Sequence, residues 1–148
     1  MWRWFSQMLP VLLAGALLAS CGRGAAGEQA GPCAAVQHPA PDSAEGQAII
    51  AGLVKTQPSL AGYAPPPDWV RGIDQLNDWA IVETNGTDQF EPGVFVVHKQ
   101  GAEYRFVTVW GGVATQPNEI QNWLREQAPA APATLFDCFR PHGAPFSG

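Results

Sequence analysis

Apolar residues recur at helical spacing near each end of the segment 33–139. In residues 41–58, one helical face holds four apolar side chains, at Ile49, Ile50, Leu53 and Val54. Asp42 and Glu45 precede this face at the spacing of a capping box, and Pro58 ends it. In residues 116–129, Ile120, Trp123 and Leu124 share a second face, with Thr115 or Gln116 as the expected N-cap. The pattern therefore predicts two helices.

Four segments rich in β-branched and aromatic residues lie between these helices and predict strands. They are residues 69–73, 78–84, 93–99 and 103–110. Asn85-Gly86 marks a turn after the second segment, and Gln100-Gly101 lies between the last two. The order α-β-β-β-β-α predicts an α+β domain, a small antiparallel meander of about four strands with the helices on one side.

The last two strands form a predicted hairpin in which Lys99 pairs with Ala102 across a two-residue turn. In this register one face, expected to pack on the helices, carries Phe95, Val97, Tyr104, Phe106 and Trp110. The opposite face is a candidate partner surface, formed by Val94, Val96, His98, Glu103, Arg105, Val107 and Val109. In one interpretation a further layer covers these valines, and in the other they form an exposed ridge for a partner.

Composition and charge narrow the classes of partner. The chain has 148 residues, of which 14% are charged, against about 25% in an average soluble domain. Its formal net charge is −5, and its eight Lys and Arg residues are scattered. This balance argues against nucleic-acid binding and against electrostatic attraction to anionic lipid.

The N-terminal residues 1–20 have the layout of an export signal. Arg3 precedes an apolar run from Met8 to Ala19, which is short for a bilayer span of roughly 20 residues. The sequence Leu18-Ala19-Ser20-Cys21 then resembles the lipobox of bacterial lipoproteins. That resemblance implies cleavage before Cys21, whose side chain receives a diacylglyceryl group and whose amine is usually acylated. It implies an envelope protein anchored to the membrane by lipid, in the outer membrane facing the periplasm if the source is Gram-negative.

Two further cysteines, Cys33 and Cys138, remain for a disulfide in this oxidising compartment. The expected layout is a signal peptide over residues 1–20, a lipidated flexible tether over 21–32, one α+β domain over 33–139 and a loose tail over 140–148. A redox or nucleophilic thiol is the alternative for the cysteine pair, although no CxxC motif is present.

Candidate chemistry is sparse in this sequence. His98 and Glu103 are close enough in the predicted hairpin to form an acid/base pair or a simple polar contact. His38 and His142 lie in proline-rich segments, so we expect no metal site and no cofactor. The tryptophans Trp69, Trp79, Trp110 and Trp123 fill the core in one interpretation and stack on carbohydrate in the other.

The helix followed by strands ending in VVHKQGAEYRFVTVW is similar to the meander of cystatin-like and NTF2-like domains. Those folds host enzymes, inhibitors and binding modules, so the resemblance implies no function. We expect a non-catalytic binding or adaptor module for an envelope protein or a small ligand. One alternative is an inhibitor of a hydrolase of the lysozyme or protease class that uses the loop 85–93. The other is a small enzyme with a pocket between sheet and helices, in which His98, Glu103 or Asp78 acts.

Overall fold

The computed structural model describes residues 31–142 and confirms an α+β fold with a four-stranded antiparallel sheet in the order β1-β2-β3-β4. The strands are β1 (Val70–Leu76), β2 (Trp79–Thr84), β3 (Gly93–Gln100) and β4 (Glu103–Gly111). The helices are α1 (Ala44–Thr56), α2 (Glu119–Gln127) and α3 (Ala133–Cys138), with a short 3₁₀ turn η1 (Pro58–Leu60). The signal peptide, Cys21 and the tether as far as residue 30 lie outside the described residues, as do residues 143–148.

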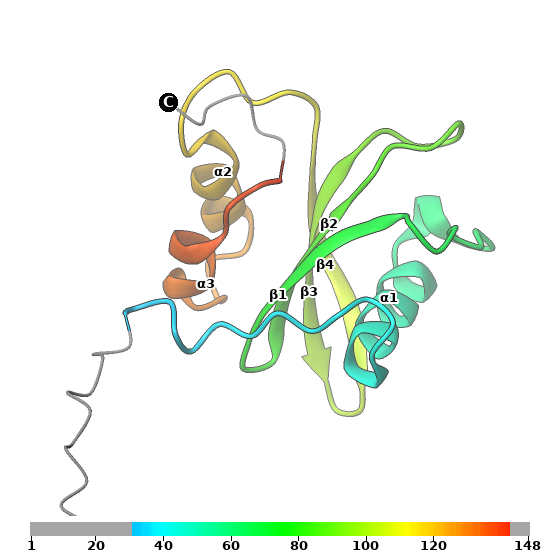
Figure 1. The fold of residues 1–148 in the computed structure, drawn as a ribbon, viewed down its shortest axis with the longest axis horizontal. Helices are drawn as coiled ribbons and strands as arrows, with labels where there is room; N and C mark the ends of the chain where they lie inside the picture. The colour runs from blue at the N-terminus through cyan, green and yellow to red at the C-terminus, as the bar shows by residue number, and fades with distance from the viewer. Residues whose placement is uncertain (1–30, 143–148) are drawn as a thin grey trace, which may run out of the picture.

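Helices cover both faces of the sheet, which corrects the expectation that they share one side (Figure 1). The helix α1 packs over one face, where its Ile49 and Leu53 join Val97 and Tyr104 in one apolar cluster. The helices α2 and α3 pack over the other face, around Val96 and Leu124. The α3 helix was not predicted because it is only six residues long, yet its Leu135 and Phe136 are fully buried.

The helix starts differ from the predicted caps. Ser43, rather than Asp42, caps α1, because its hydroxyl accepts a hydrogen bond of 3.1 Å from the Gly46 amide. Asn118 takes the N-cap position of α2 in a left-handed conformation, with φ 59°. The carboxylate of Glu119 accepts bonds from the amides of Thr115 (2.6 Å) and Gln116 (3.0 Å), which lowers the pKa of Glu119.

The hairpin register also differs from the prediction. Gln100 pairs with Glu103, so Gly101 and Ala102 form the turn, and Gly101 takes a positive φ of 66°. This placement is favoured because glycine tolerates that conformation. The predicted pair of Lys99 with Ala102 is wrong, since Lys99 pairs with Tyr104.

A β-bulge in β4 redistributes the last side chains of the sheet. Val96 pairs with Thr108 and Val97 with Phe106, which leaves Val107 as the extra residue. An extra residue reverses the alternation beyond it. Trp110, predicted on the face of Tyr104, therefore lies on the α2/α3 face, and Val109 lies on the α1 face.

The predicted disulfide is confirmed. The sulfur atoms of Cys33 and Cys138 are 2.00 Å apart and close a loop with a sequence separation of 105. The bond ties the N-terminal segment of the domain to the end of α3. It therefore fixes the C-terminal helix over the sheet face that carries the cavity described next.

Candidate functional site

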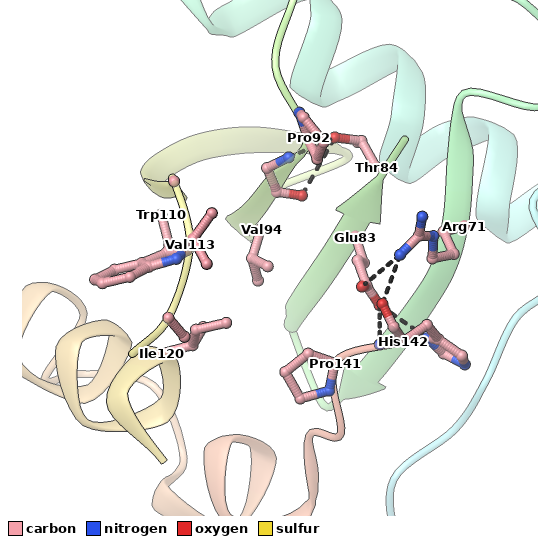
Figure 2. Close-up of a pocket in the computed structure, with 13 residues that line it drawn as sticks. Arg71, Glu83, Thr84, Pro92, Val94, Trp110, Val113, Ile120, Pro141 and His142 are labelled. Carbon is pink, nitrogen blue, oxygen red and sulfur yellow. Dashed lines mark hydrogen bonds and ion pairs between the residues drawn. The ribbon is translucent and has the colours of Figure 1, made fainter. Parts of the chain in front are cut away.

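A cross-strand row of three side chains forms the floor of a cavity on the α2/α3 face. Glu83 of β2 pairs with Val94 of β3, and Val94 pairs with Trp110 of β4. All three line a cavity of about 230 Å³, shown in Figure 2. Because neighbouring strands lie about 4.8 Å apart, the row spans about 10 Å from Glu83 to Trp110.

The walls of this cavity come from three connecting segments. Pro92 comes from the β2–β3 loop, Val113 and Ala114 from the β4–α2 loop, and Pro141 from the C-terminal segment. Ile120 of α2 closes the side next to Trp110 (Figure 2). Val113 is 78% exposed, so the rim of the cavity presents an apolar side chain to solvent. The site is apolar in its middle and polar at both ends.

Glu83 provides the polar end of the cavity at β2. Its carboxylate oxygen Oε2 accepts from the backbone amide of His142 (2.9 Å) and lies 2.8 Å from the Nδ1 atom of the same residue. Arg71 lies 3.6 Å from the other oxygen and donates to the His142 carbonyl oxygen at 2.5 Å. The Glu83 side chain is only 8% exposed, so the contacts with His142 and Arg71 compensate for the burial of its carboxylate. His142, which falls in the segment predicted as a loose tail, is thus bound to the sheet.

Trp110 provides the opposite end, with an unsatisfied donor. Its ring packs edge-on against Trp123 of α2, with ring centres 5.5 Å apart. The indole nitrogen Nε1 is buried and has no hydrogen-bond partner among the described residues. A buried N–H without a partner is uncommon and costs about 1–3 kcal/mol. By contrast, the nearby Thr84 hydroxyl is satisfied by the backbone of Gly93.

The predicted partner surface does not form one exposed patch. Val94 is 5% exposed and Val96 is fully buried, because α2 and α3 cover them. Val107 packs against the same cluster, whereas Val109 lies on the opposite face. The exposed-ridge interpretation therefore fails for these valines. The covering layer consists of α2, which was expected on the other face, and of α3, which was not predicted.

The polar members of that surface make separate contacts. The His98 ring stacks on Trp79, with ring centres 4.1 Å apart, and His98 pairs with Arg105 across the hairpin. Glu103 instead accepts a 2.7 Å hydrogen bond from Lys55 of α1, which lowers the pKa of Glu103. The predicted pairing of His98 with Glu103 is wrong, because the register is shifted.

The loop 85–93, Asp78 and Trp69, also considered as candidates from the sequence, make contacts that stabilise the fold. In the loop 85–93, Asn85 accepts a bond from Arg71, and Phe90 packs edge-on against Tyr63 with ring centres 4.7 Å apart. Asp78 accepts a bond from the Lys99 amide through its backbone carbonyl oxygen. Trp69 is 1% exposed and belongs to the core.

A second polar network joins α1 to the sheet. The Tyr104 hydroxyl donates to the Oε1 atom of Glu45 at 2.5 Å, and the Gln75 amide donates to the Tyr104 hydroxyl oxygen and to the same Glu45 atom. The bond from Tyr104 is the main reason that the pKa of Glu45 lies below its usual 4.5, and Lys99 adds a smaller effect. Burial, together with Glu45, raises the pKa of Tyr104. This network joins α1 to β1 and β4 and stabilises the fold.

The sequence singled out Val94 and Trp110 for other roles and missed Glu83 and Arg71, although one signal for Glu83 was present. Glu83 follows Trp79 and Ile81 at alternate positions of β2, so an acid occupies the inward face of an apolar strand. Such a residue needs a buried partner. Its partners Arg71 and His142 lie at sequence distances that no local pattern reveals.

Comparisons with protein-family models, with curated proteins and with solved structures found no match. Within residues 31–142, no helix is long and apolar enough to cross a membrane. The same described residues contain no group of three or more His, Cys, Asp and Glu side chains arranged to hold a metal ion.

Proposed function

We propose that this protein is a lipid-anchored, non-catalytic binding module of the bacterial envelope that holds a small ligand in the cavity above Glu83, Val94 and Trp110. The lipobox resemblance at Cys21 supports the anchor. The Cys33–Cys138 disulfide fits an oxidising compartment such as the periplasm.

The observation that carries the proposal is the unpartnered Trp110 N–H in the wall of an apolar cavity. Ligand pockets combine apolar walls with a few placed polar groups that fix the ligand's orientation. Here Val94 and Ile120 supply apolar contact, and the buried indole N–H of Trp110 has no partner among the described residues. The matching ligand has a compact apolar body and a hydrogen-bond acceptor, such as a carbonyl oxygen, directed at Trp110.

Catalysis is the weaker interpretation of the same geometry. His142 and Glu83 form a carboxylate–histidine pair at the cavity rim. The nearest hydroxyl in the lining, that of Thr84, is engaged with the Gly93 backbone and is poorly placed to act as a nucleophile. We therefore propose that Glu83 and His142 close one end of the cavity and take no part in catalysis.

The test follows the indole N–H resonance of Trp110 in a ¹⁵N–¹H spectrum of the full chain in detergent. The probes are small apolar molecules that carry one carbonyl group, each paired with the hydrocarbon that lacks it. We expect saturable shifts of the Trp110 signal with the carbonyl compounds and weaker effects with the hydrocarbons. A Trp110→Phe variant assigns the signal.

Val113→Asp is the matched blocking variant, because it places a charge at the rim in an exposed position that folding does not need. Ala102→Asp, which places the same charge in the exposed hairpin turn, is the control. The proposal predicts that binding weakens in Val113→Asp and persists in Ala102→Asp. Equal responses in both variants, or a Trp110 signal that no probe shifts, would overturn it.

A further inference from the structure

Two histidines, one near each end of the described residues 31–142, line one hollow beside β1. His38 follows Gln37, which is hydrogen-bonded to Gln75 of β1 in both directions at 2.8 Å. His142 comes from the C-terminal segment. Both rings border a hollow of about 270 Å³, together with Gly72 of β1. The hollow shares Arg71 and His142 with the ligand cavity, but neither Trp110 nor Val94 lines it.

Each of these histidines is oriented by a carboxylate. The Nδ1 atom of His38 lies 2.7 Å from Asp74, and that of His142 lies 2.8 Å from Glu83. When Nδ1 carries the proton and donates it to the carboxylate, the Nε2 lone pair is free. The side chains are 69% and 65% exposed, so both rings are accessible.

The sheet sets the spacing of the pair. Glu83 lies opposite Gly72, and Asp74 is two residues further along β1, so both carboxylates belong to one face of the sheet. Residues two apart in a strand are separated by about 7 Å. Gly72 leaves room for the His142 ring, whose Cε1 atom would lie 3.2 Å from a Cβ at that position. Two imidazoles are therefore held over neighbouring points of one strand.

We propose that His38 and His142 form a binding site for a late first-row transition metal ion, with Zn²⁺ as the probe. Neutral imidazole is a preferred ligand for Zn²⁺, Cu²⁺ and Ni²⁺. Metal-binding histidines nearly always donate their second N–H to a carboxylate or carbonyl group, and both rings here do so. Asp74 and Glu83 act as positioning residues.

The site has two protein ligands, because the described residues form no group of three. Water completes the coordination, so we expect reversible binding with an exchangeable metal. Arg71 also lines the hollow, and its charge is directed at Glu83 and at the His142 carbonyl oxygen. The proposal does not depend on the proposed ligand cavity.

The test is calorimetric titration of the full chain in detergent with Zn²⁺, in a buffer that does not bind metal, with Mg²⁺ as the control ion. We expect one Zn²⁺ ion per chain and no heat from Mg²⁺ binding. His38→Gln and His142→Gln should each weaken Zn²⁺ binding by more than tenfold. Asp74→Asn should weaken it by about 10-fold, through loss of ring orientation.

His98→Gln is the matched control, because it removes the third histidine of the chain, which is stacked on Trp79. Zn²⁺ should also shift the imidazole ¹⁵N signals of His38 and His142 and leave those of His98 unchanged, which reports the ligands without any substitution. Absent Zn²⁺ binding, unchanged binding in His38→Gln, or equal loss in His98→Gln would overturn the site. Heat and imidazole signals report the metal site, whereas the Trp110 signal of the unsubstituted chain reports the ligand cavity, so failure of one proposal is distinguishable from failure of the other.

Discussion

A single carboxylate oxygen of Glu83 binds both the backbone amide and the imidazole of His142, at 2.9 and 2.8 Å. These contacts tie the C-terminal segment to the end of β2, one of the two inner strands of the sheet, and close one end of the cavity. Glu83 belongs to β2 and His142 follows α3, so the contact joins elements 59 residues apart.

Glu83→Ala should therefore release the C-terminal segment. The loss of hydrogen bonds to a buried charged group predicts a fall of about 1–3 kcal/mol in the free energy of unfolding. Amide hydrogen exchange at His142 should accelerate, because its N–H loses its acceptor. Glu91→Ala, which removes the same charge from an exposed loop position, should leave both quantities unchanged. Unaltered exchange at His142 in Glu83→Ala would contradict this arrangement.

Gly52→Ala should destabilise the protein, although alanine usually stabilises a helix interior relative to glycine. A Cβ at residue 52 of α1 would lie 2.4 Å from the carbonyl oxygen of Tyr104 in β4. The helix must move away from the sheet, at a cost of about 1–3 kcal/mol. Thermal unfolding measures the effect. Ala51→Ser, at an exposed position of the same helix, serves as the comparison, and an increase in the unfolding midpoint of Gly52→Ala would refute the close packing.

Tyr104→Phe should remove a pH-dependent part of the stability. The folded state lowers the pKa of Glu45 below its usual 4.5, so ionised Glu45 stabilises the fold above that pH. This contribution is lost as the pH falls through the pKa that Glu45 has in the folded state. The variant should thus be less stable than the wild type by about 1–2 kcal/mol at neutral pH. The difference should shrink in acid.

Denaturant unfolding between pH 3 and pH 7 tests this pH dependence. Tyr63→Phe is the control, because Tyr63 makes edge-on aromatic contacts with Trp69 and Phe90 that phenylalanine keeps. A difference between Tyr104→Phe and wild type that stays constant across the range would show that the hydroxyl does not act through Glu45.

Loss of the disulfide should lower stability substantially. The bond closes a loop with a sequence separation of 105, for which chain-entropy arguments give about 4–5 kcal/mol. Replacing both Cys33 and Cys138 with serine should shift the urea midpoint downward, and reductant should shift the wild-type midpoint in the same direction. The double variant should not respond to reductant. Equal midpoints for the oxidised wild type and the double variant would argue against a stabilising role.

Cys21→Ser should abolish incorporation of labelled palmitate and release the protein from the membrane fraction, because stable attachment requires buried acyl chains. Cys33→Ser should keep the label, since that cysteine belongs to the disulfide. Membrane fractionation and labelling in a bacterial host measure both outcomes. Persistent labelling of Cys21→Ser would eliminate the lipobox assignment.

Local patterns in the sequence identified most of the elements and their order. The four strand segments agree with β1 to β4, and the helical face of Ile49 and Leu53 agrees with α1. These elements were predictable because the periods of apolar residues reflect burial directly. The pairing of Cys33 with Cys138 followed from counting the cysteines left after Cys21.

The sequence by itself determined the four strands, the helices α1 and α2 and which cysteines join, because these properties follow from neighbouring residues and simple counting. Only the tertiary structure decided which side chains lie on each face of the sheet and which helices cover them. The bulge at Val107 exchanges Val109 and Trp110 between the two faces, and helices cover both sides. Glu83, Trp110 and the histidine pair meet through contacts between distant segments, which no local period encodes. The candidate sites therefore depend on strand register and on the C-terminal segment, and a shift of register moves every side chain that follows it.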